Sequence, residues 1–546
     1  MEAGLSNADD IMIMDRLLNT DDDQAHKRVA EISSKASQYD RGDTSKKIAL
    51  GGLIFTTLFS TTCMAVGVVV ALHPISPLDI VVDPESHISN DPVRGIYIVL
   101  VQASNSHREL IGLALNVLVT LCTEVVGFTH SAALKSALIW ESRLHFNTNL
   151  RLFTSARNPR HSTRSFLGIR INFNGRFVNF MMAILLIMSY VSSSLILLPF
   201  QPSAPWDKTT SYLNSGSSSW LLGTPIFLLG FTLFVQAVFA FGAFYTTPIL
   251  TWSSSAFSIT AALVEHGMVV PCPNRCMHTV RDHNKEDGPQ HPLRIQPSPW
   301  EAHPRIRRVI ILLWALVPVC FAWGGIAWGI GHAAGILQIN KPQSFAFLPN
   351  KNTTAMVFDI EGSLDFFMWF MNFLLIGVIQ GSLTLGLHCT ELINNVVRDE
   401  LTWRRATSRD GLRLGMNPVM SVISSAPTVA LLIAKPLLHW LFGLSFNAQG
   451  DVNEAPPVVF LAVSLCMRPA QIWYLGVALL IFAASTTLLA RWHPKGPQPA
   501  VYGHIQVLAD LVDEWYPVMW WGEKGDGHAG IADHPLPDVD MDLLYM

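Results

Sequence analysis

The sequence predicts an all-α, polytopic membrane protein with about eight transmembrane helices. Half of its 546 residues are hydrophobic and only 14% are charged, whereas about a quarter of the residues of an average soluble protein are charged. Eight separate stretches are also long enough to cross the membrane, since about 20 apolar residues span the hydrocarbon layer. A soluble fold of this length is excluded because too few charged residues remain to cover its surface.

The eight predicted spans cover residues 48–72, 109–130, 177–200, 220–244, 309–333, 364–388, 419–444 and 470–490. We expect them to divide the chain into an N-terminal segment (1–47), a first transmembrane half with spans 1–4 (48–247), a linker loop (248–308), a second half with spans 5–8 (309–490) and a C-terminal tail (491–546). The N-terminal segment contains acidic clusters, unlike a signal peptide, so the first span is expected to act as the signal anchor.

The distribution of Lys and Arg predicts the orientation. Of the 37 basic residues, 30 lie in segments that are cytosolic if the N-terminus is cytosolic, six lie in the opposite loops, and Lys435 lies within the seventh span. Because basic residues accumulate in cytosolic loops, both termini are expected in the cytosol. The sequon Asn352-Thr353-Thr354 then falls in an outer loop. We therefore expect a glycoprotein of the plasma membrane or secretory pathway, glycosylated at Asn352.

The two halves share a pattern of loop lengths that suggests an internal repeat. In each half the first outer loop is long (73–108 and 334–363) and the second is shorter (201–219 and 445–469). Each long loop contains two β-like runs, at 79–82 and 95–101 in the first half and at 344–348 and 355–360 in the second. We therefore expect short β-hairpins in the outer loops. The pattern indicates either a parallel 4+4 repeat, as in some transporters, or a coincidence of loop lengths.

Two of the predicted spans carry polar side chains along one face. The second span carries Asn116, Thr120 and Glu124, and the seventh carries Ser425, Thr428, Lys435 and His439. Polar groups in hydrocarbon are costly and usually face a bundle interior or a cavity, so Glu124 and Lys435, the deepest charges, are expected to form an ion pair. This pair is either a point on a polar pathway or a structural contact that fixes which helices are neighbours. Pro427 and Pro436 are expected to kink the seventh span.

The predicted cytosolic segments contain a candidate metal motif and an ordered tail. Cys272, Cys276, His278 and His283 could form a zinc site in principle. The Cys-x3-Cys spacing is atypical, however, so reduced thiols are expected, with no metal or other cofactor. Residues 503–515 have helical periodicity, and the tail beyond them contains many large apolar residues. The tail is therefore expected to dock on the cytosolic loops, forming a small ordered cap.

Composition also limits the partners. The net charge of −4 gives no sign of a nucleic-acid-binding protein, and no nucleic acid is expected as a partner. The expected partners are the lipid bilayer and proteins that bind the cytosolic face. Gly325 and Gly329 form a small-xxx-small motif, which favours internal helix packing and leaves a homo-oligomer open.

Several short motifs in the tail resemble those of a known family. They are Gly503-His-Ile-Gln-Val-Leu-Ala-Asp-Leu-Val-Asp-Glu-Trp515, Trp521-Gly522, His528-Ala-Gly530, Leu536-Pro, Met541-Asp542 and Tyr545. Together with residues 147–151 and 386–392, this tail is similar to that of a family of fungal multi-pass membrane proteins to which no activity is assigned. The resemblance implies a fungal membrane location and nothing about catalysis.

No P-loop, nucleophile elbow, His-Glu-x-x-His pair or EF-hand loop occurs in the sequence. We therefore expect a non-enzymatic scaffold or sensor whose cytosolic face binds partners. The first alternative is a transporter or channel that uses the polar faces of spans 2 and 7. The second is a membrane-embedded enzyme, with His388, Cys389 and Glu391 as the first candidate residues. A hydrated cavity joining the two polar faces would favour transport, and a dry core would favour a scaffold.

Overall fold

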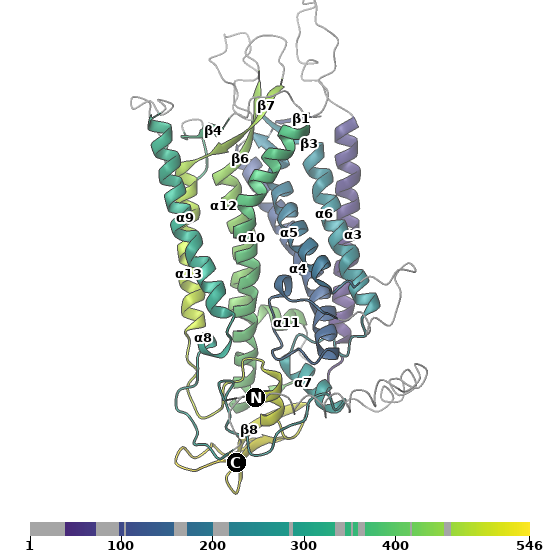
Figure 1. The fold of residues 1–546 in the computed structure, drawn as a ribbon, viewed down its shortest axis with the longest axis vertical. Coiled ribbons are helices and arrows are strands. Elements are labelled where there is room, and N and C mark those ends of the chain that lie inside the picture. The colour runs from purple at the N-terminus through teal and green to yellow at the C-terminus, as the bar shows by residue number, and fades with distance from the viewer. Residues whose placement is uncertain are drawn as a thin grey trace, which may run out of the picture.

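The computed structural model describes residues 39–72, 98–102, 105–157, 172–199, 218–282, 288–333, 344–350, 353–358, 366–414, 418–452 and 460–546. Within these ranges, eight helices are long and apolar enough to cross a membrane. They run side by side along the long axis of the molecule (Figure 1). The chain is therefore mostly helical, with the elements of a multi-pass membrane protein that the sequence predicts.

The eight long helices are α3 (Asp43–Leu72), α4 (Asn105–Trp140), α5 (Arg176–Leu195), α6 (Gly223–Thr246), α9 (Ile306–Ala333), α10 (Phe366–Trp403), α12 (Ala426–Ser445) and α13 (Pro469–Ala490). The longest are α4 and α10, with 36 and 38 residues. Both continue well past the predicted ends of their spans at residues 130 and 388. At a rise of 1.5 Å per residue each is over about 50 Å long, so each extends beyond a hydrocarbon layer of about 30 Å.

The predicted seventh span is not one helix. It divides into α11 (Pro418–Ile423) and α12, with Ser425 in an extended conformation between them. The expected kink at Pro427 is therefore a complete break, which is a correction to the prediction. Pro427 lies in the first turn of α12, where a missing N–H is tolerated. Pro436 lies inside α12, and the helix continues through it.

In each half, the first long helix packs against the last. α3 packs along α6, and α9 packs along α13. The halves meet where α4 contacts α12 and where α5 contacts α10. α3 and α6 approach so closely that a Cβ added to Gly230 would lie 2.5 Å from the carbonyl oxygen of Ser60. A Cβ added to Gly325 or Gly329 would meet nothing within 4 Å, so among the described residues this motif makes no close helix contact.

One end of the bundle, which we call the sheet end, carries two three-stranded antiparallel sheets (top of Figure 1). The first contains β1 (Ile98–Gln102), β2 (Leu197–Pro199) and β3 (Ser218–Leu222) in the order β1-β3-β2. The second contains β4 (Met356–Phe358), β6 (Phe446–Val452) and β7 (Phe460–Met467) in the order β4-β7-β6. In both, the strand from the long loop pairs with a strand of the second loop of the same half.

These pairings differ in detail from the expected hairpins. The runs at 95–101 and 355–360 contribute to β1 and β4. The run at 344–348 makes only an isolated bridge, between Ser344 and Thr353, and the run at 79–82 lies outside the described residues. β6 and β7 do pair with each other, in the second loop rather than the long one.

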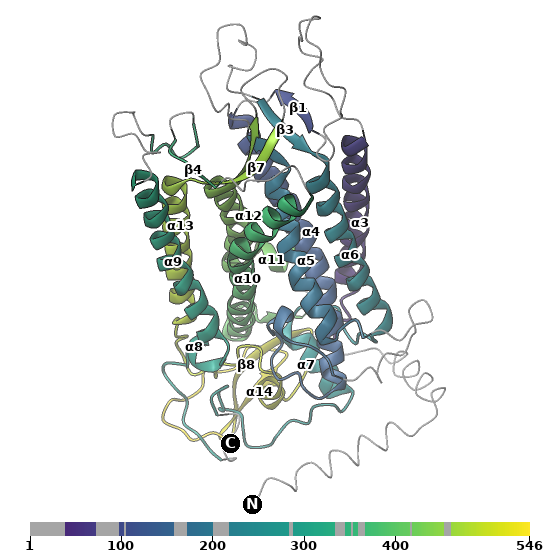
Figure 2. The same ribbon diagram turned by 45° about the horizontal axis from the view of Figure 1, so that its top comes forward.

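The opposite end, which we call the cap end, carries a small folded cap beneath the bundle (Figure 2). The described parts of residues 248–305 supply α7 (Ala256–Glu265) and α8 (Pro299–Ala302). The tail supplies α14 (Ile505–Leu511), β8 (Val518–Gly525) and β9 (His528–Ala532), and β8 pairs with both β9 and β5 (Leu412–Arg413). α14 is shorter than the helix expected at 503–515.

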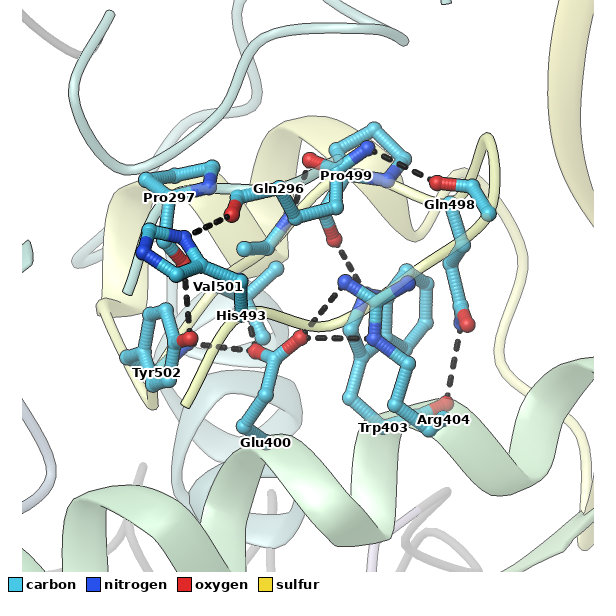
Figure 3. A network of polar contacts seen from close by, with 12 residues as sticks. Gln296, Pro297, Glu400, Trp403, Arg404, His493, Gln498, Pro499, Val501 and Tyr502 are labelled. Atoms are coloured by element: carbon cyan, nitrogen blue, oxygen red, sulfur yellow. Dashed lines mark hydrogen bonds and ion pairs between the residues drawn. The ribbon is translucent and has the colours of Figure 1, made fainter. Parts of the chain in front are cut away.

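Glu400, near the C-terminal end of α10, holds the tail against the bundle (Figure 3). Its side chain is fully buried, and its Oε2 accepts hydrogen bonds from the amides of Val501 and Tyr502 at 2.9 and 3.0 Å. Its Oε1 accepts one from Arg404 Nε at 2.8 Å. Because α10 also carries Glu391, which binds Lys435 inside the bundle, the docked tail and the polar interior share one helix.

Candidate functional site: a charged triad and cavity

Three helices place charged side chains in one layer of the bundle. Lys435 of α12 donates hydrogen bonds from Nζ to Glu124 Oε1 of α4 and to Glu391 Oε1 of α10. Lys435 is only 1% exposed, so its charge is compensated inside the bundle. The ion pair between Glu124 and Lys435 expected from the sequence is present, and Glu391 is a second partner. We call these three residues the charged triad.

The break in the seventh span is held next to the triad. Asn394, three residues after Glu391 on α10, donates a hydrogen bond to the Pro427 carbonyl at 2.6 Å. Pro427 lies in the first turn of α12, so this hydrogen bond attaches the start of α12, just after the break, to α10. Thr428 donates to Ser425 Oγ at 2.8 Å. Ser425 and Thr428, two of the predicted polar residues, therefore contact each other at the break and stabilise it.

His388 adds an imidazole to the triad. Its Nδ1 lies 3.0 Å from Glu391 Oε1, and its buried Nε2 has no hydrogen-bond partner among the described residues. Glu124, His388 and Glu391 have potential ligand atoms within 4.8 Å of one another, a spacing that could hold a metal ion. The Lys435 ammonium binds both carboxylates, however, and its positive charge disfavours a second cation at the same place. We interpret Lys435 as the internal cation of this group.

A second polar layer lies about one helical turn from the triad, toward the sheet end. The rings of Tyr190 (α5) and His439 (α12) stack with centroids 3.6 Å apart and planes inclined by 10°. The Tyr190 hydroxyl lies 3.1 Å from Thr120 Oγ1, and Gln380 Nε2 lies 3.4 Å from His439 Nδ1. Both stacked rings are fully buried. We call Tyr190 and His439 the aromatic plug, because their buried rings lie in the bundle on the sheet-end side of the triad.

A cavity of about 590 Å³ lies between the triad and the cap. Its charged and titratable lining residues are Glu124, Lys135, Arg151, His388, Cys389, Glu391, Arg398 and Lys435. Most of the other lining side chains are apolar and come from α3, α4, α10, α11, α12 and residues 148–153. Its lining includes Ile48, Phe153 and Ile423, which are 43%, 62% and 61% exposed. The cavity therefore reaches the side of the bundle near the cap end, between α3 and α11.

The basic side chains of the cavity differ in what they bind. Lys135 donates to Asn147 Oδ1 at 3.0 Å, and Arg398 lies 3.6 Å from Asp399 Oδ1. The Arg151 guanidinium makes no hydrogen bond to any described residue and lies against α4 at Gly127, where an added Cβ would be 2.9 Å from Nη2. Arg151 is thus the lining cation whose hydrogen-bond donors are unused within the described part of the chain.

The other predicted site residues lie away from the triad. Asn116, nearer the sheet end, accepts a weak hydrogen bond from Ser193 at 3.4 Å. In the cap, Cys272, Cys276 and His278 do not form a metal-binding group among the described residues. Their atoms instead contact Asp510, Met546 and Gln290, respectively. His283 and Asn352 lie outside the described residues.

Only part of this site was predicted from the sequence. Glu391 and His388 were expected only as candidate residues of an enzyme, although their spacing of three residues places both on one face of a helix. Tyr190 and Arg151 were not predicted. Tyr190 is one aromatic residue in an apolar span, and Arg151 is one of many basic residues in a predicted loop, so neither had a local signal.

Comparison of this chain with models of protein families, with curated proteins and with solved structures finds no match. The geometry of the charged triad, the aromatic plug and the cavity is therefore the basis for assigning a function.

Proposed function

We propose that the protein is a carrier that moves a small solute across the membrane through the cavity between its two halves. The observation on which this proposal depends is the cavity, because it joins the polar faces of α4 and α12 at the charged triad. Pockets for small molecules are typically apolar with a few convergent polar groups, and this cavity has that composition. A bundle without such a cavity would instead have favoured the scaffold or sensor expected from the sequence.

The arrangement of the two halves supports the same function. The sheets share the order first-third-second strand, and each half pairs its first long helix with its last. The contact of α4 with α12 corresponds to that of α10 with α5 if the halves are equivalent. These equivalences support a parallel 4+4 repeat, and carriers built from repeats bind their solutes near the interface between them.

The aromatic plug supports a carrier rather than an open channel. The cavity reaches the triad from the cap end, and the buried rings of Tyr190 and His439 lie beyond it. A carrier exposes its site to one side at a time, so we interpret this arrangement as the state open toward the cap end. In the orientation proposed from the basic residues, that side is the cytosol of the fungal cell suggested by the tail motifs.

Opening the plug tests the pathway without knowledge of the solute. We expect Tyr190→Ala, reconstituted in vesicles that enclose a pH-sensitive dye, to raise the proton leak about tenfold or more, which corresponds to a barrier lowered by about 1.4 kcal/mol. His439→Ala removes the other ring and should leak as well. Tyr245→Ala, at an exposed position of α6, is the control and should not. Reconstituted, folded Tyr190→Ala and His439→Ala variants without a leak would contradict the proposal.

A second measurement tests whether the cavity is hydrated. Ser131 lines the cavity on α4, whereas Ser189 of α5 is fully buried in the bundle. We expect a membrane-impermeant maleimide applied from the cap end to label Ser131→Cys above the wild-type level and to leave Ser189→Cys unlabelled. Equal protection of both variants would indicate a dry core and a scaffold.

A further inference from the structure

We infer that the solute of this carrier is an amphiphile with an anionic head group, and that Arg151 binds this head group. The inference rests on the proposed function, because it assigns a ligand class to the same cavity. Three independent features support it: the charge of the lining, the unused donors of Arg151, and the apolar opening at the side of the bundle.

The first feature is the charge of the cavity. Its lining contains four basic side chains and two carboxylates, apart from the titratable His388 and Cys389. Both carboxylates, Glu124 and Glu391, already accept hydrogen bonds from Lys435. With Asp399, which lies 3.6 Å from the lining residue Arg398, three carboxylates stand against the four basic side chains, so one positive charge is in excess. A cationic solute would meet net repulsion, and an anionic solute would be attracted.

The second feature is the placement of Arg151. Its planar guanidinium has five N–H donors, and a carboxylate or a phosphate can accept two of them at once. Among the described residues none of these donors has a hydrogen-bond acceptor, although Glu391 is close enough to interact electrostatically. Gly127 allows the guanidinium to lie directly on α4, because a Cβ there would be about 3 Å from three of its atoms. Gly127 thus makes room for the Arg151 guanidinium, whose N–H donors have no acceptor among the described residues.

The third feature is the route into the cavity. Ile48, Phe153 and Ile423 line the cavity and remain largely exposed. Large apolar side chains at the edge of a pocket indicate an apolar ligand or lipid contact. The lining beyond them is also mostly apolar. A fully polar anion would gain nothing from these walls, whereas an amphiphile would place its chain there and its head group at Arg151.

Direct binding tests this inference with a fluorescent fatty acid. The intact protein is reconstituted in discs of zwitterionic lipid at pH 8 and titrated with cis-parinaric acid, its neutral methyl ester, lysophosphatidic acid as a competitor, and inorganic phosphate. We expect saturable binding of the acid and competition by lysophosphatidic acid, if the site takes either head group. The methyl ester should bind about 10- to 100-fold more weakly, as expected when a charge-assisted hydrogen bond is lost.

Variants locate the site. Arg151→Met should weaken binding of the acid about 10- to 100-fold and leave the methyl ester unchanged. Gly127→Ala should weaken it less, because its methyl group displaces only the end of a flexible side chain. The controls are Arg157→Met, an exposed arginine nearby, and Gly325→Ala, where an added Cβ meets nothing. Both should bind like the wild type.

The outcomes separate this inference from the proposed function. Equal binding of acid and ester, or unchanged binding by Arg151→Met, would overturn the anionic head group. Competition by inorganic phosphate as strong as that by lysophosphatidic acid would overturn the amphiphile and indicate a polar anion. In either case the leak of Tyr190→Ala and the labelling of Ser131→Cys would still support a carrier. Loss of those two results with intact fatty-acid binding would instead overturn the carrier and leave a binding protein.

Discussion

At the scale of single residues, the charge balance around Lys435 determines what the cavity can bind. One ammonium shared by two carboxylates leaves one net negative charge in the triad. Arg151 faces this charge across the cavity and interacts with Glu391. A bound anion would compete with Glu391 for Arg151, so ligand binding and the charge of the triad are coupled. His388 is hydrogen bonded to Glu391, so its ring lies next to the carboxylate whose interaction with Arg151 a bound anion would weaken.

His303 lies in the cap just before α9, and its burial should make the folded protein less stable in acid. Burial, and secondarily the charge of Arg305, lower the pKa of His303 to about 4. Its Nδ1 also accepts a hydrogen bond from the Arg305 amide at 3.2 Å, which a protonated nitrogen could not do. The folded state therefore favours neutral His303. The contribution of His303 to the free energy of unfolding is complete above the unfolded pKa of about 6.5, and it is lost as the pH falls toward 4.

At pH 5 this loss amounts to about 2 kcal/mol. We expect His303→Asn, which keeps an acceptor but does not titrate, to show a smaller decrease of the thermal midpoint between pH 7 and pH 5 than the wild type. The measurement is thermal unfolding of the purified protein followed by circular dichroism. His534→Asn, at a side chain that is 69% exposed, should decrease like the wild type. Parallel decreases in all three proteins would contradict the assignment to His303.

The sequence predicted the centre of the site but not its edges. Glu124 and Lys435 could be paired because charges in apolar spans are rare and must find partners. Glu391 lies beyond the predicted end of its span at residue 388, and it reaches Lys435 because α10 continues as a helix past that residue. Arg151 reaches the cavity because of the path that its loop follows. Such a path cannot be predicted from a helical or strand-like pattern in the sequence.

At the scale of elements, α10 connects the charged triad to the docked tail through Glu400. We expect Glu400→Gln to release the tail, because its amide nitrogen would place a donor against either the backbone amides of Val501 and Tyr502 or the Arg404 guanidinium. A hydrogen bond to a charged group contributes about 1.5–3 kcal/mol, so local opening should increase about 10- to 100-fold. Hydrogen exchange of residues 495–512 measures this opening directly.

The exposed Asp410→Asn, also near the cap end of α10, is the matched control and should leave exchange unchanged. Equal protection of the tail in Glu400→Gln and in the wild type would show that apolar packing alone holds it. Such packing is present, since Trp403, Leu508, Met519 and Tyr545 belong to one buried cluster. The comparison therefore separates the polar contribution to docking from the apolar one.

The predicted elements were correct where one physical signal dominated. Each of the eight predicted spans overlaps one of the long apolar helices, because hydrophobicity and length determine them. The seventh span was predicted as continuous because its apolar pattern runs through residues 419–444, whereas Asn394 stabilises the broken form from another helix. Likewise, the partners of β1 and β4 lie more than 100 residues away in the sequence, so local β propensity could not identify them.

At the scale of the whole molecule, the distribution of basic residues predicts which end of the bundle faces the cytosol. The described chain begins at Tyr39 and ends at Met546, both at the cap end, where Tyr39 and Trp515 pack in one cluster. Five groups of loops and termini hold 30 of the 37 basic residues in the predicted arrangement. Because basic loops remain on the cytosolic side, we expect the cap in the cytosol and the sheet end outside.

Two measurements on the same cells test this orientation. A C-terminal epitope tag should bind antibody only after the plasma membrane is permeabilised, since residues 491–546 belong to the cap. Asn352 should carry a glycan that an endoglycosidase removes with a shift in mobility, because glycosylation marks the outer side. Asn352→Gln and Thr354→Ala each destroy the sequon and should both abolish the shift, which controls for glycans elsewhere. A tag that is accessible in intact cells would reverse the orientation, and the cavity would then open toward the outside.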